Sequence, residues 1–216
     1  MNELNMKIET LEVAGVASAI DGMRNPLNSW DKSDSEMNDK YGFIFGKKDV
    51  ILAKKLIKSG AEHRKFLRMI QVWADFNMPR YWWSEFDTYH HNTKNSCSTM
   101  HTLLSSTISE NMFVYSNEDT VLYNEIITKL KNIQNLYILT LNNTLLKSTH
   151  DNCIIRAKRI LPEGFLQLRT VNTNYEELMN IYHQRKNHKL KDEWQDTFCK
   201  WCEGLPYFKE LCVDIN

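Results

Sequence analysis

Hydrophobic and polar residues follow two different periods along this chain. Over residues 121–137 apolar side chains recur every three or four positions, which predicts a long helix with one buried face, running to about Leu146. Alternation over residues 69–77 predicts a strand, and a second strand is expected over residues 165–171. Few strands among long helices indicate an α+β fold. The other expected elements are a strand near residues 6–13 and helices over residues 50–59, 81–86, 151–161, 175–186 and 191–203.

Turn-forming and capping residues mark the ends of several of these elements. Asp49 is expected to cap the helix over residues 50–59, and Gly60 is expected to end it. Pro79 suits the first turn of the next helix. Residues 24–41 are polar and rich in turn-forming residues, so they are expected to form a long surface loop.

The composition is that of an ordinary globular protein. With 42% hydrophobic and 25% charged residues, the 216-residue chain is expected to form one domain over residues 1–216. Lys+Arg and Asp+Glu number 27 each. The chain therefore lacks the excess of basic residues that is typical of nucleic-acid-binding proteins, and no nucleic-acid partner is expected. No apolar run approaches the ~20 residues of a membrane span, and no membrane partner is expected. Five cysteines, an odd number, favour reduced thiols and a cytoplasmic location.

The segment from Pro79 to His101 differs from the rest because it is aromatic at one end and polar at the other. It reads P-R-Y-W-W-S-E-F-D-T-Y-H-H-N-T-K-N-S-C-S-T-M-H. Buried polar groups need hydrogen-bond partners, so a polar stretch in mid-domain is costly unless it lines a site. Trp82 and Trp83 are interpreted first as packing residues, with stacking on a flat ligand as the alternative.

Other reactive residue types have simple interpretations. His90 and His91 are adjacent and no H-E-x-x-H spacing is present, so no metal site is expected. Ser98 lacks the G-x-S-x-G surroundings of a nucleophile, and hydrogen bonding to a ligand is its better role. Cys199 and Cys202 form C-K-W-C, whose spacing on a helix favours core packing over metal or redox chemistry.

The polar segment resembles a signature of the flavin-dependent thymidylate synthases. That signature reads Pro, an aromatic helix with a Gln, and then R-H-R-x-x-S-x-N-x-x-S-x-R-Y, and it fits without a gap. The residues on its Pro, Gln, first Ser, Asn, second Ser and Tyr are Pro79, Glu85, Thr93, Asn95, Ser98 and His101. Its arginines are replaced, since the R-H-R positions hold Thr88, Tyr89 and His90, and the last Arg position holds Met100.

Two later blocks resemble the family in the same order. The family's A-R-x-x-L-P corresponds to residues 157–162, where Lys158 replaces the Arg and keeps its charge without the bidentate fork. Its N-x-R-x-L and F-x-x-x-R correspond to residues 174–185. There Asn174 and Arg185 match, and Glu176 replaces the first Arg.

Weaker correspondences flank these blocks. The family's A-Q-x-E-I places Lys191 on the Gln and Glu193 on the Glu. Upstream, the family's G-H-x-S-x-x-E-H corresponds to residues 62–69, which read E-H-R-K-F-L-R-M. The shared order and spacing cover roughly residues 62–193.

The resemblance implies an α+β homotetramer that binds FAD and dUMP at sites shared between subunits. In that family methylenetetrahydrofolate gives a one-carbon unit to C5 of the pyrimidine, NADPH supplies reducing equivalents, and the flavin carries the chemistry. The reaction implied here is methylation or hydroxymethylation of dUMP. A divergent, phage-type member of the family would fit the replaced arginines.

The resemblance also implies a role for each matched position. The implied catalytic residues are Ser98 and Arg185. The implied substrate-binding residues are Glu85, Ser98, Lys158 and Arg185. The implied cofactor-binding residues are Thr88, Tyr89, His90, Asn95 and Asn174.

Two hypotheses from other classes stay open beside the enzyme. The protein would bind a pyrimidine nucleotide in the same cleft without redox chemistry, as a sequestering or regulatory module. Alternatively, it would be a structural oligomer in which the fold survives and the site does not. A flavin absorption band favours the enzyme, whereas a colourless protein that nucleotides stabilise against heat favours the second hypothesis.

The shared-site architecture predicts a homotetramer. Light scattering on the purified protein is expected to give the mass of four protomers, because each active site of the implied architecture needs residues from more than one subunit. A monomer at micromolar concentration would contradict both the assembly and the implied site residues.

Overall fold

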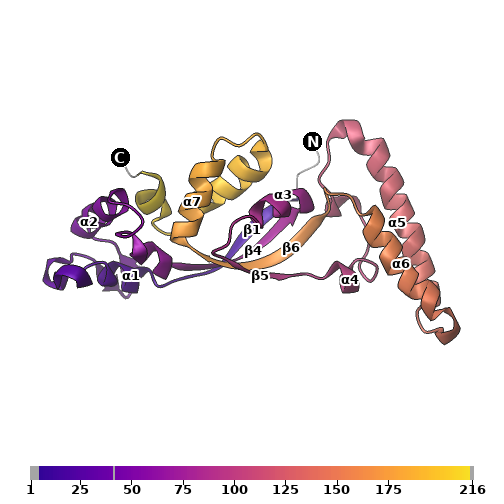
Figure 1. Ribbon diagram of the computed structural model, residues 1–216, viewed down its shortest axis with the longest axis horizontal. Coiled ribbons are helices and arrows are strands. Elements are labelled where there is room, and N and C mark those ends of the chain that lie inside the picture. The colour runs from indigo at the N-terminus through magenta and orange to yellow at the C-terminus, as the bar shows by residue number, and fades with distance from the viewer. Residues whose placement is uncertain (1–4, 41, 215–216) are drawn as a thin grey trace. The chain divides into compact units, whose positions relative to one another are not determined.

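The computed structural model describes residues 5–40 and 42–214 and has a mixed helix-and-sheet architecture (Figure 1). The main sheet has four strands in the order β1-β4-β6-β5. Its strands are β1 (Lys7–Ala14), β4 (Gln71–Pro79), β6 (Leu166–Asn174) and β5 (Thr93–Ser96). A separate antiparallel pair joins β2 (Glu36–Asn38) to β3 (Gly42–Ile44). The predicted α+β class is confirmed.

The chain divides into two compact units that interleave along the sequence. The first unit holds the described residues up to Lys7 together with residues 76–87 and 95–169. The second holds residues 8–75, 88–94 and 170–214. One domain over residues 1–216 stays a prediction. Within residues 5–40 and 42–214, no helix combines the length and apolar character needed to cross a membrane.

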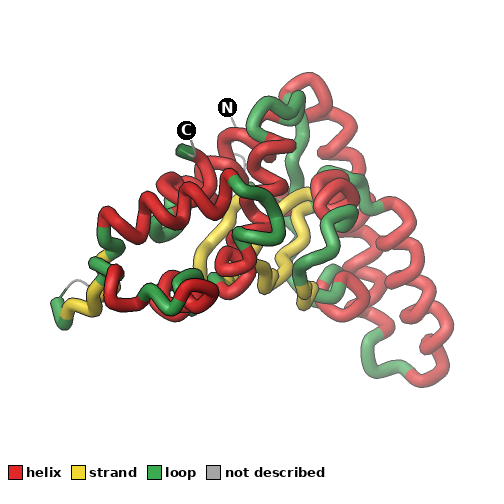
Figure 2. Tube along the Cα trace, turned by 60° about the vertical axis from the view of Figure 1, so that its left-hand side comes forward, coloured by secondary structure: helices red, strands yellow, loops and turns green. Residues whose placement is uncertain are grey.

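The first unit is dominated by a hairpin of two helices that run side by side (Figures 1 and 2). Its helices are α3 (Arg80–Phe86), α4 (Thr99–Thr102), α5 (Thr120–Thr140) and α6 (Lys147–Ile160). The apolar period of α5 buries Ile127, Leu130 and Ile133, which belong to one core cluster with Cys153 and Ala157 of α6. Periodic apolar positions therefore produce the helix because they find a partner face.

The predicted end of the long helix was wrong by about one and a half turns. Helix α5 stops at Thr140, and a short 3₁₀ turn over Thr144–Leu146 follows it. The side chain of Asn143 accepts a hydrogen bond from the backbone N–H of Leu145, which stabilises this turn. An exposed apolar residue such as Leu145 extends the sequence pattern beyond the point where the backbone leaves the helix.

The second unit contains the remaining helices. These are α1 (Val16–Gly22), α2 (Lys47–Lys58), α7 (Tyr175–Arg185), α8 (Lys200–Glu203) and π-helical segments over Lys191–Cys199 and Lys209–Val213. The sequence pattern missed α1, which is too short to show a period. Gly15 precedes it with φ of 85°, and a Cβ there would lie 2.4 Å from the carbonyl oxygen of Met69. Only glycine fits this conformation and this close approach.

Strand β4 confirms the alternation that predicted it. Val72, Ala74, Phe76 and Met78 are all buried, while the intervening residues are partly exposed. Pro79 then stands at the N-cap of α3 with φ of −70°, in agreement with its predicted place at the start of that helix.

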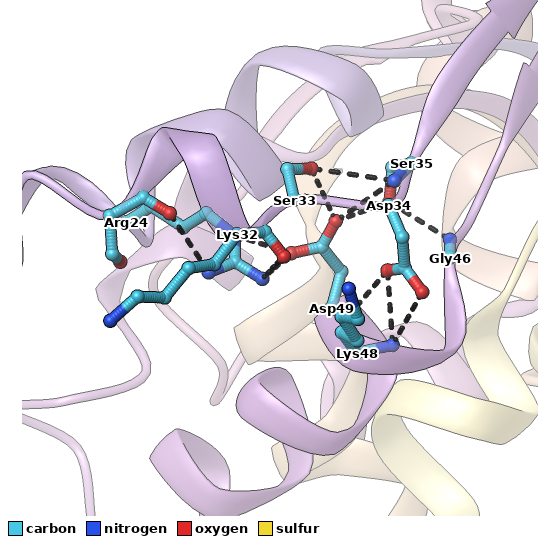
Figure 3. A network of polar contacts seen from close by, with 9 residues as sticks. Arg24, Lys32, Ser33, Asp34, Ser35, Gly46, Lys48 and Asp49 are labelled. Atoms are coloured by element: carbon cyan, nitrogen blue, oxygen red, sulfur yellow. Dashed lines mark hydrogen bonds and ion pairs between the residues drawn. The ribbon is translucent and has the colours of Figure 1, made fainter.

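The segment over residues 24–40 is mostly exposed, as predicted, but it is anchored by a polar network around the buried Arg24 and Asp49 (Figure 3). Arg24 and Asp49 are 5% and 0% exposed, and the guanidinium Nε donates to Asp49 Oδ1 at 2.6 Å. The hydroxyls of Ser33 and Ser35 both donate to Asp49 Oδ2 at 2.6 Å. The segment also forms two 3₁₀ turns and strand β2. Residue 41 of the predicted loop lies outside the described residues.

This network also corrects the predicted cap of α2. The helix begins at Lys47, so Asp49 lies in its first turn and its side chain points to Arg24 and the serines (Figure 3). Asp34 serves the helix start instead, because its carboxylate accepts from the backbone N–H groups of Lys48 and Asp49 at 3.0 and 3.2 Å. Gly60 follows the helix with φ of 106°, as its predicted role requires.

Burial raises the pKa of the Asp49 carboxyl, but hydrogen bonds from Ser33, Ser35 and Arg24 outweigh burial and lower that pKa below its ordinary value of 3.8. A carboxyl with a lowered pKa in the folded state stabilises the protein above its unfolded pKa. That stabilisation is lost as the pH falls through the folded pKa.

Replacing Asp49 with Asn is expected to lower the free energy of unfolding at neutral pH by about 3–5 kcal/mol, because the charge of Arg24 stays buried without a counter-ion. Urea denaturation measures the loss. In the parent protein the stability should decline as the pH drops below about 4, and this decline should be smaller in Asp49→Asn.

The matched control is Asp31→Asn, which removes the same charge from an exposed residue of the same segment. Its free energy of unfolding should stay within about 0.5 kcal/mol of the parent value. Equal effects of the two substitutions would show that the network around Asp49 contributes nothing specific.

Candidate functional site

A polar cleft of about 400 Å³ lies within the second unit, at the junction between β6 and α7. Asn174 ends the strand and caps the helix, since its side chain accepts from the backbone N–H of Glu177 at 3.1 Å. The cleft therefore forms where an Asn cap turns the chain from strand to helix. Its lining residues are Arg64, Arg68, His91, Asn174, Glu176, Glu177 and Asn180.

Two arginines share one carboxylate in this cleft. Arg64 Nε donates to Glu176 Oε1 at 3.0 Å, and Arg68 donates to the same carboxylate through Nε and Nη2. Burial raises the pKa of Glu176, but the hydrogen bonds from Arg68 and Arg64 outweigh burial and lower that pKa. The side chain of Glu176 is 12% exposed, whereas those of Arg64 and Arg68 are 28% and 53% exposed.

The charges in this cluster are opposite to those of the family motifs. Arg68 occupies the Glu position of G-H-x-S-x-x-E-H, and Glu176 occupies the first Arg position of N-x-R-x-L. The structure pairs the two replaced residues with each other. This pair was not predicted from the sequence, although the exchange of opposite charges at two motif positions is a signal that indicates it.

Arg185, the last residue of α7, lies among aromatic groups. Its Nε donates to the Tyr89 hydroxyl at 2.8 Å, and its guanidinium lies 4.5 Å from the ring centroid of Trp194. The Tyr89 hydroxyl in turn donates to Gln184 Oε1 at 3.1 Å. The structure thus brings together one residue predicted to bind substrate and one predicted to bind cofactor.

Tyr89 itself is only 8% exposed. Its ring packs beside Arg185 at 5.6 Å, so most of its surface is committed to the protein. Thr88 and His90 on either side of it are exposed. Of the three residues on the R-H-R positions, these two therefore have side chains accessible to a ligand.

The other predicted site residues of the first unit lie on, or at the start of, four different elements. Glu85 is half-buried in the last turn of α3, and Lys158 is exposed on α6. Asn95 is exposed on β5. Ser98 is the N-cap residue of α4, where its carbonyl oxygen accepts from the backbone N–H groups of His101 and Thr102.

Trp82 and Trp83 are packing residues, as predicted. They are 0% and 1% exposed and pack with Phe76 and Phe86. The indole Nε1 of Trp83 donates to the carbonyl oxygen of Gln167 at 2.9 Å. Their burial leaves no ring face for a flat ligand to stack on.

The C-K-W-C thiols are also buried, as core packing requires. Burial raises the pKa of Cys199 to about 12, and it raises the pKa of Cys202 and Cys212 well above the ordinary thiol value. Such thiols are poor nucleophiles and poor metal ligands. Within the described ranges no group of His, Cys, Asp and Glu side chains is arranged to hold a metal ion.

The structure resembles two crystal structures of flavin-dependent thymidylate synthase (ThyX) from Helicobacter pylori, both with FAD and dUMP. One has a TM-score of 0.70 and 18% sequence identity, covering 97% of this chain and 98% of its own. The other has a TM-score of 0.70 and 19% identity, covering 97% and 99%. No protein-family model matches the sequence, and neither does any curated protein. The expected thymidylate-synthase-like fold is confirmed over nearly the whole chain.

The burial of the cysteines predicts one fast-reacting thiol. Cys97 is exposed, whereas Cys153, Cys199, Cys202 and Cys212 are buried. A colorimetric thiol reagent should therefore modify one thiol rapidly in the native protein and all five after denaturation. Cys97→Ser should abolish the fast phase. Rapid modification of a second thiol in the native protein would contradict the burial of the other four cysteines.

Proposed function

We propose that the protein binds FAD and transfers a one-carbon unit to C5 of dUMP, in the manner of flavin-dependent thymidylate synthases. The observation that supports this proposal is the likeness of fold over 97% of the chain to two such enzymes that hold FAD and dUMP. The motif blocks between residues 62 and 193 occur in the family's order, which supports the same ligands.

The side chains that could contact a flavin nucleotide are mostly neutral hydrogen-bonding groups, because the arginines of the cleft are already paired with Glu176. The exposed Thr88 and His90 offer a hydroxyl and an imidazole, and the cleft offers Arg64 and Arg68. Asn174 also lies at this cleft, although its side-chain oxygen already caps α7. We propose that these residues and Asn95 hold FAD, with weaker affinity than a site that keeps all motif arginines.

When bound, the flavin would accept and donate the electrons of the reaction, with NADPH as reductant and methylenetetrahydrofolate as carbon donor. The protein's residues would bind and orient dUMP. Lys158 would attract the phosphate, and Arg185, held by Tyr89 and Trp194, would contact the pyrimidine edge. Ser98 and Glu85 would hydrogen-bond to the same nucleotide. Because sites of this kind are shared between subunits, we propose a homotetramer.

A second candidate function is nucleotide binding without redox chemistry. It is favoured by the replacement of the R-H-R arginines with Thr88, Tyr89 and His90, and by the neutralisation of Arg64 and Arg68 by Glu176. Each lost charge-assisted hydrogen bond weakens phosphate binding by about 1.5–3 kcal/mol. A site with that deficit would retain a mononucleotide more readily than a dinucleotide cofactor.

An absorption spectrum of the purified protein separates the two candidates. The enzyme should carry a flavin band, or acquire one after incubation with FAD and gel filtration. Addition of dUMP should raise the melting temperature of either form, because a ligand that binds the folded state stabilises it. A colourless protein stabilised by dUMP would favour the second candidate. Absence of both FAD and dUMP binding would contradict both.

Lys158→Ala is expected to weaken dUMP binding by about 2–3 kcal/mol, which is the cost of losing a charged hydrogen bond. Its melting temperature without ligand should not change, because Lys158 is exposed on α6. Isothermal titration calorimetry measures the affinity. Arg159→Ala is the matched control, since this neighbour is also an exposed cation of α6 and falls on a variable motif position. Equal weakening by both substitutions would indicate a general charge effect.

A further inference from the structure

The cleft at the start of α7 is rich in hydrogen-bond donors that the protein leaves unused. Arg64 uses its Nε toward Glu176, and its two terminal amino groups have no partner among the described residues. Arg68 likewise leaves Nη1 without a partner within residues 5–40 and 42–214. Both side chains are accessible, at 28% and 53% exposure. Unused guanidinium N–H groups around one cavity are the donor set that binds phosphate oxygens.

Glu176 occupies the place that such an oxyanion would take. Its Oε1 accepts from both arginines and its Oε2 accepts from Arg68, so one planar carboxylate bridges the two guanidinium groups. A phosphate carries more charge and more acceptor oxygens than a carboxylate. Because ion pairs of partly exposed side chains are weak, a phosphate can replace Glu176 between the arginines.

Glu177 places a hydrogen-bond acceptor beside the two arginines. It lines the cleft and the residue is only 6% exposed, but its carboxylate oxygens are not among the buried polar atoms that lack a partner in residues 5–40 and 42–214, so water reaches them from the cleft. A ligand that presents a hydroxyl or N–H group beside the arginines would replace this water as the hydrogen-bond partner of Glu177. A ligand that offers both a phosphate for the arginines and such donors for Glu177 is a nucleotide.

We propose that Arg64 and Arg68 form a phosphate site for a nucleoside diphosphate group, and that Glu176 is an internal anion which this group must displace. This proposal rests on the proposed function, because FAD contains a diphosphate group. Arg64 and Arg68 stand at positions where the family motif has no cation. The carboxylate of Glu176 then lowers the affinity of the site for every anion. Ligands with two phosphates can still displace it, whereas an anion with a single charge cannot, and this makes the site selective.

The test compares Glu176→Gln with the parent protein, using inorganic pyrophosphate and ADP as separate probes in isothermal titration calorimetry. Glu176→Gln should bind pyrophosphate about tenfold more tightly, since the competing charge is removed while the shape is kept. Glu163→Gln is the matched control, because Glu163 also pairs with an arginine and belongs to the first unit. The control should bind pyrophosphate as the parent does.

Arg64→Gln and Arg68→Gln provide the second arm in the parent background. Each should weaken pyrophosphate binding about tenfold or more, and each should remove the gain when combined with Glu176→Gln. Arg68 is more than half exposed, so its replacement should leave the melting temperature unchanged. If Glu176→Gln does not fold, this arm alone decides. Pyrophosphate binding that is indifferent to both arginines would overturn the proposal, as would a folded Glu176→Gln with parent affinity.

Glu177→Gln tests the nucleotide specificity. It should weaken ADP relative to pyrophosphate, because it removes the acceptor for the ligand's hydroxyl groups without touching the arginines. An equal effect on both probes would remove Glu177 from the site.

The outcomes also separate this inference from the proposed function. FAD that binds with unchanged affinity in Glu176→Gln and Arg68→Gln would leave the flavoenzyme standing and overturn the phosphate site. Conversely, pyrophosphate binding that follows the predicted order, in a protein that binds neither FAD nor dUMP, would retain the phosphate site and contradict the proposed reaction.

Discussion

The turn from β6 into α7 is the feature on which the candidate site depends. Asn174 ends the strand with its backbone and starts the helix with its side chain, which accepts from the N–H of Glu177. That cap fixes the direction of α7. Glu176 in the first turn thereby meets Arg64 and Arg68, and Arg185 at the last residue meets Tyr89 and Trp194. One capped helix therefore positions an anionic and a cationic group at its two ends.

The cations of this protein are redistributed relative to the motif it resembles. Positions 88, 90 and 100 hold no arginine, whereas residues 62–69 contribute Arg64 and Arg68. The total charge of the chain stays balanced, with 27 basic and 27 acidic residues. Arg64 and Arg68 both pair with Glu176, so their positive charge is balanced within the cleft and the surface does not become basic. A ligand with a phosphate would have to compete with an internal carboxylate, which is a physical basis for selectivity.

Arg185 lies on a motif position that predicts substrate binding, but it also has a packing role in the fold. Its guanidinium packs on Trp194 and donates to Tyr89, so replacing it would remove packing as well as any contact with a substrate. Lys158 is exposed on α6, so its replacement would not remove buried packing. The two cations were expected to act together on dUMP, but only Lys158 can be tested without disturbing its surroundings.

The amino-acid sequence by itself determined the α+β class, strand β4 from its alternation, and the long helix from its apolar period. These features are local, because a strand or helix repeats its pattern within a few residues. The tertiary structure decided the buried network of Arg24 and Asp49, the pairing of β2 with β3 and the cluster of Arg64, Arg68 and Glu176. Arg64 and Glu176 are 112 residues apart, so no local pattern records their contact. Burial of a charge becomes acceptable only when the fold brings its partner within hydrogen-bond distance, and the sequence pattern cannot state that distance.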